Sequence, residues 1–528
     1  MNFIRSLNPL IKIHKYSPLI IFILGVWFFC VRILGYNFEY IPGDLGDSRF
    51  INFLLEHAHQ WITGHADGFW DAAFMYPFKN TIALSDSMLG TLPFYSVWRI
   101  AGISPETSYQ LWWICICALN YWISYFIFKK WFVRSEIALV LAFIFAFSIF
   151  NIGQLNYMQM IVRFMVPVVF YAAYKMIATP SIKYLFTYCF GLVVQFYCVM
   201  YTGFHLLYFS LLFIFIYCFY SKKWKDLFFY FKKEKWLLTS FVLIASLLVA
   251  LLLLVPYLVM SKTVGLRLYK EVIIYLPTWN SFLFPHESSL AWKYLFDTFK
   301  PHVPAWWLHY LFVGIIPFTA LIISPLYLFY NWYKKIKTPL LLKTCIITSI
   351  IIVLLHLRTD AGLTLYALIF KLPGINSMRV LNRFMNVELF VLLLLVGYLV
   401  VRFKNNYLFI IVILIFADNW FSPESIPREK KADLIKRKEI LLSELSKHDL
   451  KKYSAVALVD STQPAYITHV DMMLAAQTAG IKTVNGYSSY CPDEFGEFFN
   501  HASDKGLSLW IQNQGIKREN ILLLRRNY

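Results

Sequence analysis

The chain has 528 residues, of which 59% are hydrophobic, 19% are aromatic and only 15% are charged. A soluble domain is nearer a quarter charged, so this composition and a mean hydropathy of +0.57 indicate a membrane protein with several spans. The net charge of +19 does not indicate nucleic-acid binding. The lysines and arginines fall in short clusters between apolar runs, not in a basic stripe on a soluble domain.

Eleven apolar runs are candidate spans, since a helix needs roughly 20 apolar residues to cross the bilayer core. No small-residue cleavage site follows the first run, so we expect it to remain as an uncleaved span. The lysine and arginine clusters all fall on one side if the N-terminus is cytoplasmic. An odd number of spans then places the C-terminal tail outside, whereas ten or twelve spans would place it in the cytoplasm. The runs cover residues 17–35, 107–128, 135–151, 161–178, 184–200, 203–220, 236–260, 306–330, 343–357, 384–402 and 406–420.

The sequence divides near residue 420 into a transmembrane domain, residues 1–420, and a more polar tail, residues 421–528. Helices and strands alternate in the tail, which predicts a small extracytoplasmic α/β domain. It has no Gly-rich phosphate loop and so no predicted nucleotide site. The transmembrane domain has long outer segments at 36–106, 261–305 and 357–383. The predicted tail elements are helices at 428–447 and 466–479 and strands at 454–459, 482–485 and 521–524.

The first outer segment contains one clear helical pattern, at residues 47–64. Asp47 or Ser48 suits the N-cap, and Gly64 suits the stop. The apolar residues of this stretch lie on one face, so we expect the helix to lie along the membrane surface.

Two carboxylates precede this helix in the sequence Tyr-Ile-Pro-Gly-Asp-Leu-Gly-Asp-Ser-Arg, residues 40–49. The proline and glycines predict a turn. Acidic groups held by a turn at the membrane face can act as a general base or bind a divalent ion. Asp47 has a competing role as a helix cap and Asp44 does not, so the sequence favours Asp44 as the base and Asp47 as its partner.

One N-terminal span followed by a long outer loop with an acidic motif and an amphipathic helix resembles the GT-C superfamily of membrane glycosyltransferases. The resemblance, to bacterial GT-C-like membrane proteins, implies inverting transfer of a sugar from a polyprenyl-phosphate donor on the outer face. It also implies that a first-loop aspartate is the base or a metal ligand. The adjacent Asp-Glu pair of several GT-C branches is missing, which leaves open which carboxylate is the base and whether Mg or Mn takes part. The matching stretches are Gly43-Asp44-x-Gly46-Asp47-x-Arg49 with Glu56-His57, Pro-Gly…Arg…Arg-Phe at 373–384, and Asn485-Gly486-Tyr487-Ser488.

Several polar residues of the outer segments are candidates for binding substrate. Arginine binds phosphate through paired donors, and Arg358, Arg379 and Arg383 lie on the outer side, where the positive-inside rule predicts few cations. Pairing with lipid headgroups is the alternative role. Arg267, in contrast, is interpreted as an ordinary surface charge, and Gly486 is expected to take a positive φ in a turn. The remaining candidates, each with a structural role in a turn, cap or interface as its alternative, are Arg49, Glu56, His57, Asp86, His286 and Glu287.

These features favour a glycosyltransferase of the bacterial plasma (inner) membrane, with a cytoplasmic N-terminus and an extracytoplasmic tail. Its expected partners are the lipid bilayer, a polyprenyl-phosphate-sugar donor and a glycan, lipid or protein acceptor, but no nucleic acid; the sequence carries no signal for oligomeric state. The alternative is a transporter or flippase of a lipid-linked saccharide. Transporters tend to place ionisable residues or helix breaks in mid-span, often within an inverted repeat, whereas the acids here lie in an outer loop.

Overall fold

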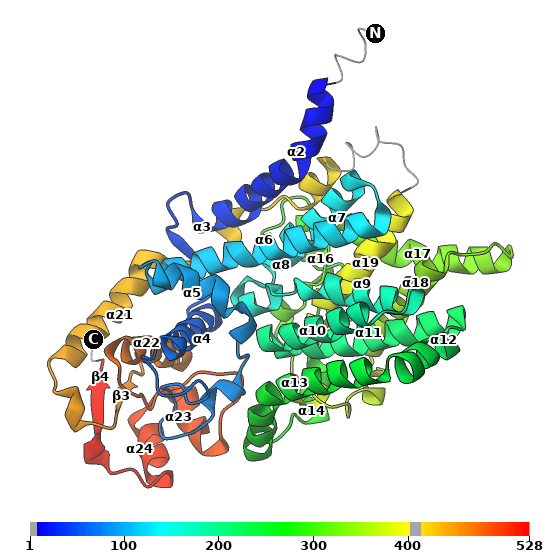
Figure 1. The fold of residues 1–528 in the computed structure, drawn as a ribbon. Coiled ribbons are helices and arrows are strands. Elements are labelled where there is room, and N and C mark those ends of the chain that lie inside the picture. Colours follow the sequence, from blue (N-terminus) through cyan, green and yellow to red (C-terminus); the bar gives the residue numbers. More distant parts are fainter. Residues whose placement is uncertain (1–7, 402–412, 527–528) are drawn as a thin grey trace.

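A computed structural model describes residues 8–401 and 413–526. Long apolar helices lie side by side in one bundle, and α4 gathers with the C-terminal elements at one end of it (Figure 1). The helices before the tail are α2 (Asn8–Gly25), α3 (Arg32–Leu34), α4 (Asp47–Ile62), α5 (Leu92–Ile100), α6 (Pro105–Phe132), α7 (Ser135–Phe147), α8 (Ile149–Ile152), α9 (Met165–Ala178), α10 (Ile182–Cys198), α11 (Met200–Ser221), α12 (Trp224–Phe228), α13 (Trp236–Val264), α14 (Tyr269–Val272), α15 (Trp279–Phe282), α16 (Lys293–Phe299), α17 (Ile315–Tyr333), α18 (Leu340–His356) and α19 (Met385–Val400).

Within the described residues, eight helical stretches are long and apolar enough to cross a membrane, in agreement with a membrane protein. Two shorter apolar helices, α10 and α18, match the predicted runs at 184–200 and 343–357. The eleventh predicted run begins within residues 402–412, which lie outside the described residues. The eight stretches are Tyr16–Leu34, Pro105–Phe132, Ser135–Ile152, Leu155–Ala178, Met200–Ser221, Trp236–Val264, Ile315–Tyr333 and Leu381–Val400.

The run predicted at 306–330 starts later than expected, because α17 begins only at Ile315. Gly314 precedes it with a φ of 97°, a conformation that ends regular structure and favours glycine. The Asp418 carboxylate then accepts the Ile315 backbone N–H at 3.0 Å, which caps the new helix. The apolar residues before Gly314 form a short 3₁₀ turn, Trp306–Leu308, instead of a helix.

The helix α4 is buried, which corrects the expectation that it lies along the membrane surface. Twelve consecutive residues, from Ser48 to His59, have little or no exposed surface. Its polar residues find partners on both sides: for example, Arg49 pairs with Asp471 of the tail and Glu56 with Arg99 of α5. These pairs make burial of the polar face possible, since a buried charge needs a partner.

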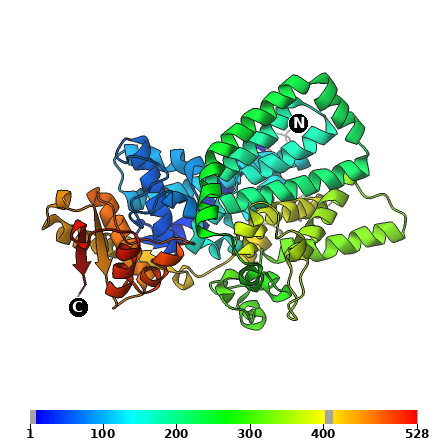
Figure 2. The same ribbon diagram turned by 90° about the horizontal axis from the view of Figure 1, so that it is seen from below.

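The tail packs directly on the first outer segment. Strand β1 (Tyr40–Pro42) pairs with β2 (Arg428–Lys430) in antiparallel register, and α22 (Ala465–Ala479) packs on α4. Figure 2 shows the tail beside the first outer segment, with the helical bundle on the far side of that segment. The first strand and the turn after it are therefore held by residues almost 400 positions away.

The other tail elements largely match the prediction. Strands β3 (Ala455–Val459) and β4 (Ile521–Arg525) are parallel neighbours. The strand expected at 482–485 is reduced to one parallel bridge between Val456 and Thr483. The backbone of Thr483 instead bonds the first outer segment, donating to Ala73 at 3.0 Å and accepting from Tyr76 at 3.0 Å. The remaining tail helices are α21 (Lys431–Ser446), α23 (Gly496–His501) and α24 (Asp504–Asn513).

Candidate functional site

The turn before α4 is shaped by its glycines. Gly43 has a φ of 95°, and its N–H donates to the Pro427 carbonyl of the tail at 2.8 Å. A Cβ on Gly46 would lie 3.0 Å from the ring of Tyr466 and 3.3 Å from the hydroxyl of Tyr487. Glycine at this position therefore lets two tail tyrosines approach the start of α4.

The helix α4 begins at Asp47 with Gly46 as its N-cap, which corrects the expected N-cap of Asp47 or Ser48. The Asp44 carboxylate accepts the Gly46 N–H at 3.0 Å, and the backbone N–H groups of Asp47 and Ser48 also point to it. Burial raises the pKa of Asp44, while these hydrogen bonds act in the opposite direction. The short side chain reaches two residues ahead, as in an Asx turn.

Asp47 is therefore free of the capping role. Burial raises its pKa to about 6, and the negative charge of Asp44 adds to this effect. The charges of Arg383 and Arg379 and a hydrogen bond with the Tyr487 hydroxyl act in the opposite direction. A carboxylate with a pKa near neutrality, facing cations and a phenol, suits a general base.

Arg379 and Arg383 come from the third outer segment and approach Asp47 without forming an ion pair with it. Arg383 belongs to a 3₁₀ turn, Leu381–Phe384. Its guanidinium lies 4.9 Å from the ring centre of Tyr157 and 4.7 Å from that of Tyr201. Within the described part of the chain, neither guanidinium has a carboxylate partner within ion-pair distance. Arginines held over aromatic rings with unused donors are suited to bind a phosphate.

Asp86 belongs to the same polar region but has a structural partner. Its Oδ1 accepts the backbone N–H of Met200, the first residue of α11, at 2.8 Å. Burial raises its pKa to about 6, and the charge of Arg383 opposes this shift. The next residue, Tyr201, accepts the Arg379 N–H at 3.0 Å and lies under Arg383. Asp86 thus holds the helix end that positions both arginines.

Three other predicted residues on α4 serve the packing of the helix. The Arg49 guanidinium bonds Asp471 at 2.6 Å. Glu56 accepts from Arg99 at 2.8 Å and from the Tyr95 hydroxyl at 2.7 Å. The His57 Nε2 lies 2.8 Å from the Phe69 carbonyl.

The predicted residues of the second outer segment and Arg358 also have local partners. The His286 Nδ1 lies 2.9 Å from the Ser288 hydroxyl, and Glu287 is exposed. The Arg358 guanidinium donates to the Ile273 carbonyl at 3.1 Å. No contact among the described residues joins these three side chains to Asp47.

Sequence reasoning missed Tyr487 as a neighbour of Asp47 and underestimated Arg267. Arg267 donates to the Ser489 carbonyl at 2.6 Å and lies 3.8 Å from the ring centre of Tyr490. It therefore joins the end of α13 to the tail, and it is not an ordinary surface charge. The position of Tyr487 depends on Gly486, which does not take the expected positive φ. Glycine is needed there because a Cβ would lie 2.1 Å from Met75.

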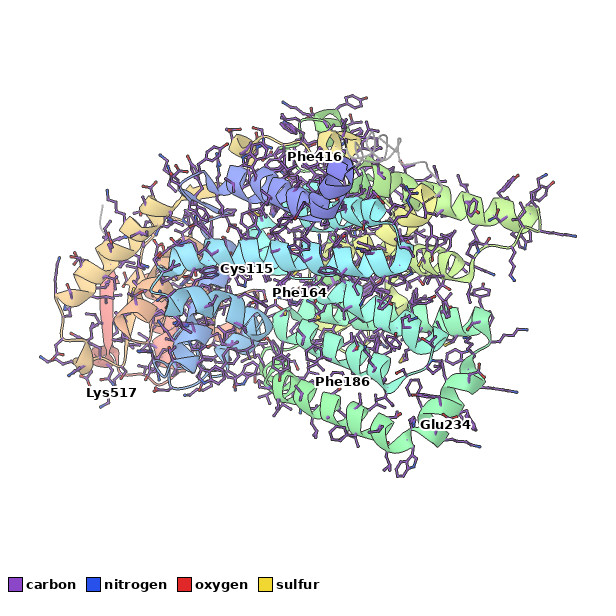
Figure 3. All side chains as sticks on the ribbon, turned by 45° about the horizontal axis from the view of Figure 1, so that its top comes forward. Cys115, Phe164, Phe186, Glu234, Phe416 and Lys517 are labelled. Atoms are coloured by element: carbon purple, nitrogen blue, oxygen red, sulfur yellow. The ribbon has the colours of Figure 1, made fainter. Side chains whose placement is uncertain are left out.

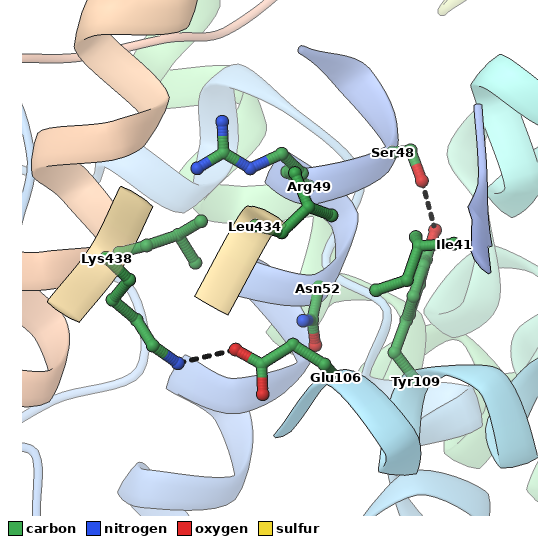
Figure 4. Close-up of a pocket in the computed structure, with 9 residues that line it drawn as sticks. Ile41, Ser48, Arg49, Asn52, Glu106, Tyr109, Leu434 and Lys438 are labelled. Atoms are coloured by element: carbon green, nitrogen blue, oxygen red, sulfur yellow. Dashed lines mark hydrogen bonds and ion pairs between the residues drawn. The ribbon is translucent and has the colours of Figure 1, made fainter. Parts of the chain in front are cut away.

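A narrow pocket lies beside α4, between that helix, α6 and α21 (Figure 4). An ion pair between Glu106 and Lys438 joins two of its walls, and the hydroxyls of Ser48 and Tyr109 meet at 3.4 Å. Asp44 and Asp47 do not line this pocket. It is part of the interface between the tail and the membrane helices.

A divalent cation is compatible with the two carboxylates. The charge of Asp44 raises the pKa of Asp47, so the two groups are close enough to repel each other, and a cation would relieve that repulsion. No group of three or more His, Cys, Asp or Glu side chains suited to a metal occurs among the described residues. Mg²⁺ is one ion that binds through one or two carboxylates and completes its shell with water and substrate phosphates.

No protein-family model and no curated protein matches the chain. A solved structure does: the apo form of the oligosaccharyltransferase of Archaeoglobus fulgidus, at 11% identity and a TM-score of 0.52. The alignment covers 95% of this chain and 69% of that one. The chain shares the fold of this archaeal enzyme. The complex of the same enzyme with Zn and sulfate aligns at 11% identity and a TM-score of 0.38, over 89% of this chain and 62% of that one.

Proposed function

We propose that the protein is a membrane glycosyltransferase of the inverting GT-C type. It transfers a sugar from a polyprenyl-phosphate-linked donor to a glycan, lipid or protein acceptor outside the bacterial plasma membrane. One observation carries this proposal: the Asp47 carboxylate, with its pKa raised to about 6, faces two arginines that have no ion-pair partner among the described residues. The shared fold supports it at a coarser level.

In the proposed reaction, Asp47 accepts the proton of an acceptor hydroxyl. The acceptor oxygen attacks the anomeric carbon, and the bond from that carbon to the donor phosphate oxygen breaks. The phosphate leaves with the bonding electrons, and Arg383 and Arg379 stabilise the charge that it gains. One displacement from the side opposite the phosphate inverts the configuration at the anomeric carbon.

Asp44 acts indirectly in this proposal, because it holds the turn before α4 and its charge raises the pKa of Asp47. A divalent cation, if the reaction uses one, would be held by Asp44 and Asp47 and would offset the negative charge of the donor phosphate.

The proposed orientation has support from the ends of the helices. α11 begins at Met200, which is bonded to Asp86, and ends at Ser221, just before Lys222 and Lys223. The site and the lysine cluster are therefore at opposite ends of a candidate span. The positive-inside rule assigns the lysine end to the cytoplasm.

The proposal is tested with the purified full chain in detergent and a short-chain polyprenyl-phosphate hexose as donor. We expect Asp47→Asn to lower donor consumption by about 10²- to 10⁴-fold, the usual contribution of a general base. The double variant with Asp44→Asn should be inactive and folded. Asp67→Asn, which alters an exposed carboxylate of the same segment, is the matched control and should keep full activity.

Full consumption of the donor by the double variant would sink the assignment. The assay in detergent also distinguishes the two candidate functions, because a glycosyltransferase consumes the donor there and a transporter or flippase does not.

A further inference from the structure

A lysine-rich connection lies at the other end of the bundle, where α12 and a π-helical turn, Phe229–Glu234, join α11 to α13. In Figure 1, α12 and α4 lie at opposite ends of the helical bundle. Figure 3 shows Glu234, in this turn, far from Lys517 of the tail. The helix α11 separates the two ends by about 33 Å, at 1.5 Å per residue for its 22 residues.

The connection borders an open hollow of about 790 Å³ against the start of α13. Three lysines line it, Lys225, Lys232 and Lys233, and none has an ion-pair partner among the described residues. Two of them lie over aromatic rings. The Lys232 Nζ is 4.9 Å from the ring centre of Phe228, and the Lys233 Nζ is 5.7 Å from the ring centre of Phe229. The hollow is therefore cationic at its rim and apolar along its walls.

One residue that lines the hollow has a hydroxyl group without a partner. Thr239 lines the hollow, and its Oγ1 has no hydrogen-bond partner in the described part of the chain. A buried hydroxyl without a partner costs free energy, so it marks a place where a ligand acceptor would be favourable. Phosphate oxygens are such acceptors, and lysines are suitable counter-charges for them.

The surroundings of the hollow indicate a lipid. Only 11% of the apolar window of α13 is buried inside the protein, so this candidate span faces acyl chains over most of its length. Trp224 and Trp236 line the hollow at the ends of the connection, and tryptophan is typical of the headgroup level. We propose that this hollow binds an anionic phospholipid, with the headgroup phosphate against Lys225, Lys232, Lys233 and Thr239 and the acyl chains along α13.

The test measures lipids retained by the purified full chain in native mass spectrometry. The chain is incubated with phosphatidylglycerol or phosphatidylcholine of the same acyl length. A lysine near an anionic lipid is worth about fivefold in affinity, so three predict a preference for phosphatidylglycerol well above tenfold. The triple variant Lys225→Gln, Lys232→Gln, Lys233→Gln should lose that preference. Thr239→Val, which leaves every charge in place, should weaken binding by about threefold.

The matched control changes Lys334, Lys335 and Lys337 to Gln in another exposed lysine-rich connection. It should keep the preference, and equal loss in the control would mean diffuse attraction and would overturn the proposal. The proposal also fails if the triple variant or Thr239→Val binds phosphatidylglycerol as well as the natural chain. Displacement of the lipid by millimolar inorganic phosphate would assign the hollow to a free anion instead.

Discussion

Two carboxylates three residues apart have different environments in this protein. Asp44 accepts backbone N–H groups at the start of α4, whereas Asp47 faces Tyr487, Arg379 and Arg383. The backbone hydrogen bonds of Asp44 hold its carboxylate in the turn and oppose the rise in pKa that burial causes, whereas the pKa of Asp47 is raised to about 6. The residue better placed to accept a proton is therefore Asp47, and the negative charge of Asp44 raises the pKa of Asp47.

The pH dependence of transfer tests this division. The base must be deprotonated, so activity should rise as the pH increases through about 6, the pKa of Asp47. Asp44→Asn removes a negative charge that raises this pKa, so the acidic limb of the profile should move to lower pH. Tyr487→Phe removes a hydrogen bond that lowers the pKa, so the limb should move to higher pH.

Initial rates of donor consumption between about pH 4 and 8 measure both shifts. Tyr453→Phe removes a tail hydroxyl that has no described contact with Asp47, and it should leave the limb in place. Shifts in the same direction for Asp44→Asn and Tyr487→Phe would contradict the proposed electrostatic roles.

At the scale of elements, the third outer segment contains arginines with two kinds of environment. Arg358 donates to the Ile273 carbonyl near the end of α18, whereas Arg383 lies over Tyr157 and Tyr201 with its donors unused. The sequence alone does not distinguish the two arginines as phosphate ligands, because Arg358 directly follows one apolar run and Arg383 directly precedes another. Their environments differ only because tyrosines from distant parts of the chain pack against Arg383.

This difference predicts different kinetics for two matched variants. Arg383→Gln should raise the KM for the donor by about 10- to 100-fold, the worth of a hydrogen bond to a charged group. Arg358→Gln should leave the KM unchanged and lower thermal stability, because its guanidinium bonds only the protein. Arg383→Lys should not restore the KM, since lysine lacks the paired donors. A KM that rises equally in Arg358→Gln would remove the basis for assigning the phosphate to Arg383.

The elements that local signals could predict are those with strong periodicity or length. Most of the long apolar runs, the helix after Asp47 and the tail helix at Ala465–Ala479 appear close to the predicted positions among the described residues, whereas the run predicted at 306–330 begins only at Ile315. The environment of α4 could not be predicted, because its polar residues Arg49 and Glu56 pair with residues far away in the chain. Tyr487 was missed for the same reason: its contact with Asp47 depends on how the tail docks, and no local pattern encodes that.

At the scale of the whole molecule, one buried carboxylate joins the tail to the first outer segment. Asp471 of α22 is fully buried and pairs with Arg49 of α4, Arg437 of α21 and Arg526 after β4, at 2.6, 2.6 and 3.2 Å. Burial alone would raise the pKa of Asp471, but the charges of Arg49 and Arg437 outweigh it and hold that pKa below its ordinary value. The tail and the helix that begins at Asp47 should therefore open together.

Asp471→Asn tests this coupling by amide hydrogen exchange of the full chain in detergent. It leaves Arg49 buried without a counter-charge, which typically costs about 3–5 kcal/mol. Exchange should therefore accelerate by about 100-fold or more in both α4 and α22. Because the folded pKa of Asp471 is lowered, the natural chain has this stability at any pH above the ordinary aspartate value and loses it as the pH falls through the lowered pKa. Asp504→Asn breaks an exposed pair with Arg525 and should leave exchange in α4 and α22 almost unchanged, because solvent screens that pair. Acceleration confined to α22 would mean that α4 is held by the membrane helices alone, and the tail would then have no part in positioning Asp47.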